Sequence, residues 1–216
     1  MKIDMEDRII ESAMQYTRKV FEKEGSGHDF WHTLRVYNNA MFIAKNENCN
    51  VFLVKLAALL HDVDDTKIFG GTIGQHDNAK SFMMENGCDS DTIERVCKII
   101  DQIYFNGKDT QTPNTIEGKI IQDADWLDAM GAVGIARTFT FGGNKNRAIY
   151  NPDILPKEYV PHEAYDTTTT INFICERLLK LKDLMNTNTG AILAEQRHRF
   201  IETYLEEFFD EFNGEK

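Results

Sequence analysis

The sequence lacks the cysteine pattern and the leader segment that mark several large classes of protein. Its 216 residues include only four cysteines, and no two of them form a C-x-x-C pair. This excludes a zinc-finger pattern and a dense disulfide framework, and it favours reduced thiols in an intracellular protein. The first eight residues carry three acids where a signal peptide requires an apolar stretch, so we expect a cytoplasmic protein.

Long apolar runs and an excess of positive charge are also missing. The longest apolar run, Val51 to Val63, is interrupted by Lys55 and is shorter than the roughly 20 residues that a membrane-spanning helix needs. We therefore expect no membrane partner. The 35 Asp and Glu residues outnumber the 24 Lys and Arg residues and give a formal net charge of -11, which repels a phosphate backbone. Stable binding to nucleic acid is not expected either.

Helical periodicity dominates the sequence, and candidate strands are hard to find. Apolar residues recur at three- and four-residue steps, as amphipathic helices require, in the ranges 3–21, 34–44, 52–60, 79–84, 93–103, 116–127, 171–185 and 192–212. The last two ranges are typical of long helices. The sequence therefore predicts an all-α helical bundle, formed by a single domain over residues 1–216 in which C-terminal helices (about 166–213) complete the core.

One irregular stretch, about residues 142–166, interrupts the helical pattern. It contains three of the four prolines. A stretch of this length in a compact domain is often a lid or a binding loop, and an ordered structural excursion explains it equally well. Its role stays open on the sequence alone.

Two histidines and two aspartates are the most informative polar residues: His32, the adjacent pair His61-Asp62, and Asp125. The pair follows directly on an apolar helical segment. An ionised carboxylate there costs on the order of several kcal/mol unless it is paired or bound to a metal. A hydrogen bond or a helix cap explains each residue taken alone. Together they form a mixed nitrogen and oxygen set that suits Mn²⁺, Fe²⁺ or Zn²⁺ better than Mg²⁺ or Ca²⁺.

The order of these residues resembles the HD superfamily of metal-dependent phosphohydrolases. The resemblance extends to four flanking segments, which read HTLRV at 32–36, HDVDDTK at 61–67, DADWLDAMGA at 123–132 and LLKLKDLMNT at 178–187. They are similar to the small single-domain bacterial branch of the superfamily over roughly the whole chain. The resemblance implies an all-helical fold of the HD-domain type around one divalent ion, with His32, His61, Asp62 and Asp125 as ligands.

The donor set bears on the choice of metal, and the resemblance implies a role for one further acid. Mn²⁺ is favoured, and Fe²⁺, Co²⁺, Ni²⁺, Zn²⁺ or Mg²⁺ are alternatives. Asp65 lies four residues after His61, so it shares a face with that ligand if the helix continues, and an acid at this position in relatives holds or deprotonates a metal-bound water. Its neighbour Asp64 is expected to be solvated or to cap a helix.

Three basic residues are candidates for binding the phosphate groups of a substrate: Arg35, Lys67 and Arg137. Arg35 lies one helical step after His32, which would bring its guanidinium near the metal. A surface ion pair explains Arg35 equally well. Lys67 stands where the branch favours a lysine. Together these side chains would neutralise charge on a phosphate chain.

Two positions depart from the family pattern, and one histidine bears on the number of metals. Trp126 stands where Arg is common, and we expect it to pack in the core. Phe173 stands where a histidine often occurs.

His76 is the only histidine between the His61-Asp62 pair and Asp125. We expect it to be solvated and not to bind metal, which leaves one metal per chain.

The expected activity is hydrolysis of a soluble nucleotide or another phosphorylated small molecule. Walker, dinucleotide-binding and G-x-S-x-G motifs are absent, so phosphates would be held by metal and side chains. Cleavage of a phosphoanhydride in a nucleoside triphosphate is the preferred reaction. A 5'-nucleotidase, a phosphodiesterase and a non-catalytic regulatory module that binds metal and nucleotide remain alternatives, and a homodimer is left open.

Overall fold

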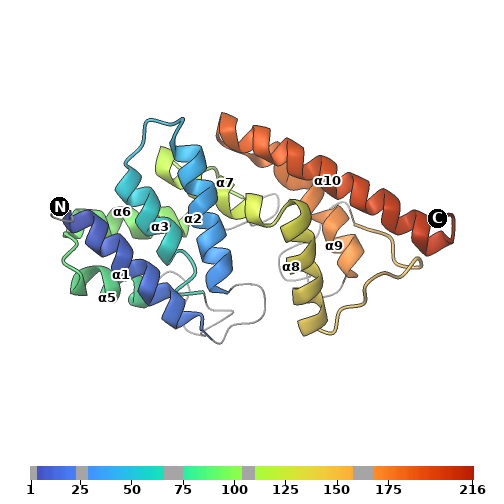
Figure 1. Ribbon diagram of the computed structural model, residues 1–216, viewed down its shortest axis with the longest axis horizontal. Helices are drawn as coiled ribbons and strands as arrows, with labels where there is room; N and C mark the ends of the chain where they lie inside the picture. The colour runs from blue at the N-terminus through green and yellow to red at the C-terminus, as the bar shows by residue number, and fades with distance from the viewer. Residues whose placement is uncertain (1–3, 23–28, 66–74, 104–109, 158–167) are drawn as a thin grey trace. The chain divides into compact units, whose positions relative to one another are not determined.

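A computed structural model describes residues 4–22, 29–65, 75–103, 110–157 and 168–216 (Figure 1). Every regular element in these ranges is a helix, which confirms the all-α prediction. None of the described helices combines the length and the apolar character that crossing a bilayer would require. The described residues form two compact units, one up to residue 125 and one from residue 126 onward. That both belong to one domain stays a prediction.

Helix α3 is the centre of the N-terminal unit. The unit contains α1 (Met5–Val20), α2 (Phe30–Ala44), α3 (Val51–Leu60), α5 (Asp77–Glu85), α6 (Ser90–Asp101) and most of α7 (Ile116–Asp128). Seven of the ten residues of α3 are buried, and α3 packs against α1, α2 and α6. A helix that is apolar on nearly all sides is stable only when it is enclosed in this way. The end of α3, and the residues that follow it directly, therefore lie in the interior of the unit.

Side-chain caps fix where the helices of this unit begin. Asp29 precedes α2 and Asn50 precedes α3, and the side chain of each accepts a hydrogen bond from a backbone amide in the first turn that follows. The backbone amide of Asn50 in turn donates to Glu117 Oε1 at 2.8 Å. The first turn of α7 is thereby joined to the start of α3.

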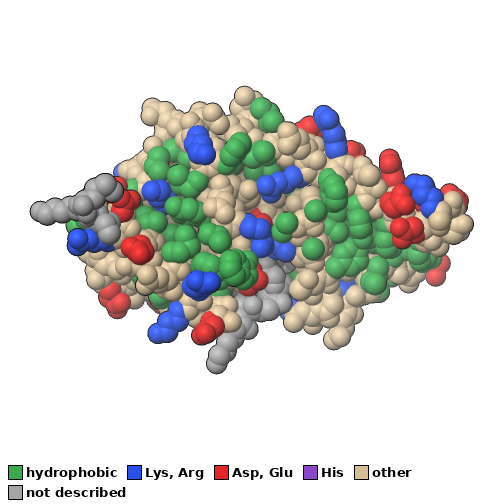
Figure 2. Space-filling model, in the orientation of Figure 1, with side chains coloured by type: hydrophobic (Ala, Val, Ile, Leu, Met, Phe, Trp, Pro, Cys, Tyr) green, Lys and Arg blue, Asp and Glu red, His purple; other side chains and the backbone are tan. Residues whose placement is uncertain are grey.

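The C-terminal unit is built around a long terminal helix. It contains α8 (Gly131–Asn144), α9 (Thr170–Glu176), the 3-10 helix η3 (Leu178–Leu184) and α10 (Asn188–Asn213). Helix α10 packs against α8 and η3. Figure 2 shows acidic side chains gathered at the end of α10, where Lys216 Nζ lies 2.8 Å from Glu207 and 2.9 Å from Asp210. A cation at this end of a helix is favourable because it faces the negative end of the helix dipole.

The prediction of one long helix over 171–185 is wrong. The α-helix ends at Glu176, Arg177 has φ -125 and ψ -59, and the chain continues as a 3-10 helix. Leu178 and Leu181 are both buried. Residues three apart are aligned in a helix with three residues per turn, so the 3-10 form directs both leucines to one side.

Helix α8 was not anticipated because it contains four glycines, at positions 131, 134, 142 and 143, and glycine disfavours a helix. Two of them are required by close packing. A Cβ at Gly134 would collide with the backbone carbonyl of Ala129, and one at Gly142 would lie 2.5 Å from Thr170 Oγ1. Gly131 has φ +69, which favours glycine.

The described part of the irregular stretch, up to residue 157, is held against α9. The amide of Thr170 donates to the carbonyl of Ala148 at 2.9 Å, and Asn172 Nδ2 donates to the carbonyl of Ile154 at 2.7 Å. The amide of Lys157 donates to Glu176 Oε1 at 2.7 Å. These bonds favour the structural alternative for residues 145–157, and residues 158–166 lie outside the described ranges.

The glycines of α8 give a direct test of this packing. Gly134→Ala should lower the free energy of unfolding by about 1–3 kcal/mol, because the added methyl group meets a backbone carbonyl that cannot turn away. The matched control is Gly143→Ala, where an added Cβ meets no atom within 4 Å. That change should be neutral or stabilise by up to about 1 kcal/mol. Equal effects of the two changes in urea unfolding would contradict this account.

Candidate metal centre

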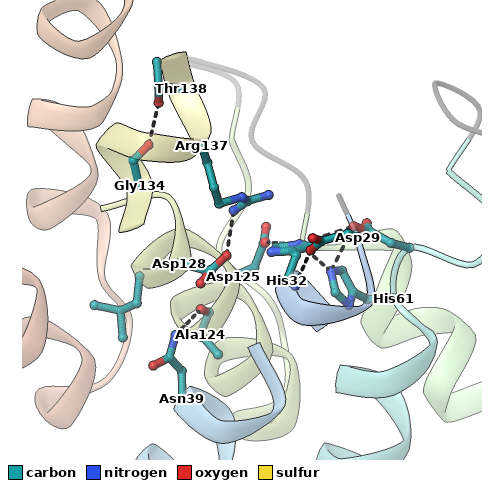
Figure 3. A network of polar contacts seen from close by, with 12 residues as sticks. Asp29, His32, Asn39, His61, Ala124, Asp125, Asp128, Gly134, Arg137 and Thr138 are labelled. Carbon is teal, nitrogen blue, oxygen red and sulfur yellow. Dashed lines mark hydrogen bonds and ion pairs between the residues drawn. The ribbon is translucent and has the colours of Figure 1, made fainter. Parts of the chain in front are cut away.

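His32 lies in the first turn of α2, and its backbone is fixed by the residue that caps the helix. Asp29 Oδ1 accepts a hydrogen bond from the His32 amide at 2.9 Å. This bond satisfies one of the free amides at the helix start. His32 itself is 2% exposed, and Figure 3 shows its ring directed toward His61. A capped first turn and a buried ring give this imidazole a defined position.

His61 and Asp62 follow the last residue of α3 and meet His32 inside the N-terminal unit. His61 Nε2 lies 3.3 Å from His32 Nε2, and Asp62 Oδ2 lies 3.3 Å from both nitrogens. All three residues are buried, and together they form a group able to hold a metal ion. Donor atoms separated by about 3.3 Å fit ligands that lie ~2.0–2.1 Å from a central cation.

The hydrogen bonds around this triad leave donor atoms directed at its centre. His61 Nδ1 lies 2.9 Å from the carbonyl of Ala58, an arrangement in which Nδ1–H donates and the lone pair of Nε2 faces the other ligands. Histidine ligands of metals are commonly oriented by such a bond to a carbonyl. Asp62 Oδ2 is buried and has no hydrogen-bond partner of acceptable geometry. The residues therefore fit a divalent cation.

The charges of the triad are strongly coupled. Burial alone would lower the pKa of His61, but the carboxylates of Asp62 and, to a lesser degree, Asp125 outweigh it and raise that pKa to about 9. For Asp62, burial acts to raise the pKa, yet the two imidazoles hold it well below its ordinary value. Without metal, a proton on His61 thus balances the buried carboxylate.

Asp125 approaches the triad from α7. Its Oδ1 lies 3.5 Å from His32 Nε2, and its side chain is 30% exposed, against 7% for that of Asp62. Figure 3 shows Asp125 on the side of His32 that faces α7. The structure thus brings together all four residues named by the sequence, with three enclosed and the fourth at a partly open edge. Their role as metal ligands stays a prediction.

Asp65 lies in a turn and not in a continuation of the helix that precedes His61. The condition for Asp65 to share a face with His61 is therefore not met. Helix α3 ends at Leu60 and does not continue to Asp65. The amide of Asp65 donates to the carbonyl of Asp62 at 3.0 Å, so Asp65 lies one 3-10 step after Asp62. Asp65 is half-buried, and its role in holding or deprotonating a water stays a prediction.

The three basic residues have different surroundings. Arg35 is half-buried on α2, one turn after His32. Lys67 lies outside the described residues. In the C-terminal unit, Arg137 Nη1 lies 2.7 Å from Oδ2 of the buried Asp128. That ion pair orients the guanidinium, and phosphate binding by any of the three residues stays a prediction.

Three expectations about neighbouring residues can be compared with the structure. His76 is buried, not solvated, because its Nε2 pairs with Asp101 Oδ1 at 2.7 Å. Asp64 caps a helix as expected, since its carboxylate accepts hydrogen bonds from the amides of Asn78 and Ala79 at the start of α5. Trp126 is 4% exposed, which confirms that it packs in the core.

Sequence reasoning missed two residues that support the site. Asp29 had a recognisable signal, because aspartate is a preferred capping residue and it lies three positions before His32. Asn39 had none. Its Nδ2 donates to the carbonyl of Ala124 at 3.2 Å across 85 positions of sequence. A single side chain on one helix does not reveal so distant a partner.

Comparison with known proteins places these residues in a family context. The HD domain family model matches residues 30–130, which include all four residues of the site. YpgQ of Bacillus subtilis (strain 168) is 34% identical over 206 residues, which cover 94% of each chain. The L803 protein of Acanthamoeba polyphaga mimivirus is 32% identical over 156 residues, covering 64% of this chain and 63% of that protein.

Solved structures agree with the fold along nearly the whole chain. A Lactobacillus plantarum protein superposes with a TM-score of 0.84 at 32% identity, covering 96% of this chain and 98% of that one. An HD-superfamily hydrolase from Bacillus thuringiensis gives 0.76 at 37%, covering 96% and 98%. B. subtilis YpgQ in complex with ADP gives 0.77 at 31%, covering 96% and 97%. The chain therefore belongs to the HD superfamily of metal-dependent phosphohydrolases.

Proposed function

We propose that the chain hydrolyses nucleoside triphosphates to the monophosphate and pyrophosphate, using one divalent metal ion bound by His32, His61, Asp62 and Asp125. The observation that carries this proposal is the convergence of these four side chains in the N-terminal unit, three of them with donor atoms 3.3 Å apart and Asp125 within 3.5 Å of His32. Separate parts of the chain supply them, and no ordinary packing role requires all four in one place.

The donor set favours particular metals. Two imidazoles with two carboxylates suit Mn²⁺, Fe²⁺, Co²⁺ or Zn²⁺ better than Mg²⁺ or Ca²⁺, which prefer oxygen ligands throughout. Among these we propose Mn²⁺. A bound divalent ion supplies a charge that lowers the pKa of a coordinated water from 15.7 toward ~7 and polarises a phosphoryl oxygen.

The residues around the site then have distinct tasks. Asp65 holds the attacking water and accepts its proton. The water adds to the α-phosphorus, the bond from that phosphorus to the α,β-bridging oxygen breaks, and pyrophosphate leaves. Arg35, Lys67 and Arg137 are proposed to bind the phosphate oxygens, whose charges would otherwise repel a chain of net charge -11.

A relative supports the choice of a nucleotide. B. subtilis YpgQ, which is 31% identical and matches this chain along 96% of its length, has been crystallised in complex with ADP. ADP shares the phosphate chain and the nucleoside of the proposed substrate. Because the ligand belongs to a protein of the same fold and family, a nucleotide is the favoured substrate class for this chain as well.

A substrate screen tests the proposed reaction. Purified protein with added Mn²⁺ should convert nucleoside triphosphates to monophosphates and pyrophosphate, identified by phosphorus NMR, while a His61→Ala variant should be inactive. Release of phosphate from monophosphates would instead indicate a 5'-nucleotidase. If every nucleotide binds but stays intact with Mn²⁺, Co²⁺ and Mg²⁺, the chain is a binding module and the proposed reaction is wrong.

Asp65→Asn tests the proton acceptor. The amide keeps the shape of the side chain but cannot take a proton, so the turnover rate should fall by roughly 10²- to 10⁴-fold with unchanged metal content. Asp64→Asn is the matched control. It removes one of the two oxygens that accept amide hydrogen bonds at the start of α5 and should cost about 1 kcal/mol of stability with the rate preserved. Equal turnover of the Asp65 variant and the unaltered protein would remove this residue from the mechanism.

The raised pKa of His61 predicts proton release on metal binding. With a pKa of about 9, His61 of the metal-free protein is protonated at neutral pH, and the proton stabilises the folded state most below about pH 6.5 and not above about pH 9. Each ion bound near pH 7.5 should displace about one proton, whereas an ordinary histidine would release only about a tenth of one. Titration calorimetry in buffers of different ionisation enthalpy measures this number, and His198→Asn should leave it unchanged.

A further inference from the structure

Two helices of the N-terminal unit are joined by a side-chain bond beside the proposed metal site. Asn39 of α2 donates from Nδ2 to the carbonyl of Ala124 in α7, at 3.2 Å. Figure 3 shows the two groups next to each other, with Asp125 directly following Ala124 on α7. A carbonyl oxygen has two lone pairs, so it can accept this bond in addition to one within its own helix.

The position of Asn39 relates this bond to the site. Asn39 lies seven positions after His32 on α2, and seven positions are close to two helical turns, so both lie on the same face of the helix. The same face of α2 thus carries the His32 ring and the Asn39 side chain, which donates to the α7 backbone one residue before Asp125. A shift of α7 by a single residue would move Asp125 by about 1.5 Å along the helix axis.

Asp125 needs such a bond more than the other three residues do. The enclosed packing at the end of α3 holds His61 and Asp62, and the cap at Asp29 holds the turn of His32. Asp125 has a partly exposed side chain, 30%, and lies 3.5 Å from the nearest nitrogen of the triad. Its distance to the triad therefore depends on where the α7 backbone lies.

Two further side chains attach α7 to the N-terminal unit. Gln122, three residues before Asp125, donates from Nε2 to the carbonyls of Gln102 at 3.0 Å and Gln111 at 3.1 Å. Glu117, in the first turn, is 8% exposed and accepts the bond from the Asn50 amide at 2.8 Å. Asp125 lies eight positions after Glu117, which is about 12 Å along a helix. Glu117 thus holds the start of α7 and Gln122 holds its middle, whereas Asn39 joins the turn that carries the carboxylate to α2, the helix of His32.

We propose that Asn39 is a positioning residue of the metal site: its carboxamide holds α7 at the distance from α2 at which Asp125 completes the ligand set. This inference rests on the proposed metal site. Asn39 acts through Asp125, so its contribution to metal binding disappears when the Asp125 carboxylate is absent.

A double-mutant cycle measures this dependence. The affinity for Mn²⁺ is determined by titration calorimetry for the unaltered protein, Asn39→Ala, Asp125→Ala and the double variant. Asn39→Ala should weaken binding about tenfold, the lower range for residues that support a metal ligand. In the Asp125→Ala background the same change should have no effect. The neighbouring exposed residue gives a matched control, since Asn38→Ala should bind as the unaltered protein does.

A spectroscopic measurement separates positioning from general loss of stability. At saturating Co²⁺, the visible spectrum of Asn39→Ala should shift toward that of Asp125→Ala, because the Asp125 carboxylate would be displaced from the metal in one variant and absent in the other. Asn39→Leu, which retains the volume of the side chain, should behave in the same way and serves if the alanine variant does not fold.

The outcomes distinguish the two levels of the proposal. If the unaltered protein binds no divalent metal, the proposed function fails. If it binds metal and the Asn39 variants bind equally well, or are weakened equally with and without Asp125, then Asn39 does not act through that carboxylate and the inference is overturned.

Discussion

Enclosure of a carboxylate between two imidazoles is the constraint on which the rest of the site depends. Asp62 is 5% exposed, and a buried carboxylate is tolerated only with compensating positive charge. The two imidazoles meet this need through the proton that His61 carries without metal, or as joint ligands of a cation. The same geometry is therefore stable without metal and ready to accept one, provided that a proton leaves.

The surrounding helices serve this arrangement in a consistent way. Helix α3 is mostly buried, so His61 and Asp62, which follow it directly, lie in the interior. Two acids in the turn after α3, Asp62 and Asp64, have different tasks. Asp62 contacts the imidazoles, whereas Asp64 receives the amides at the start of α5. One short turn thus carries both the chemistry and the attachment of the helix that follows.

Much of this could be predicted from the sequence, and the exceptions have physical causes. Periodicity found the all-α class, and a short adjacent pair, His61-Asp62, indicated the site because its chemistry is unusual next to an apolar helix. Helix α8 was missed because its glycines permit close packing while lowering helix propensity. Periodicity also does not reveal that α3 ends at Leu60, so the continued helix that would align Asp65 with His61 is absent. Asn39 was missed because a bond across 85 positions leaves no local pattern.

The unequal enclosure of the four donor atoms has a kinetic consequence. His32, His61 and Asp62 are closed off from water, whereas the Asp125 carboxylate borders it. In the proposed metal site, an ion exchanging with the medium would therefore meet this carboxylate at the partly open edge, while the three enclosed side chains keep their arrangement. The time that an ion stays bound would then depend on movements of the α7 turn that carries Asp125. A bound ion could be exchanged without opening the hydrophobic interior.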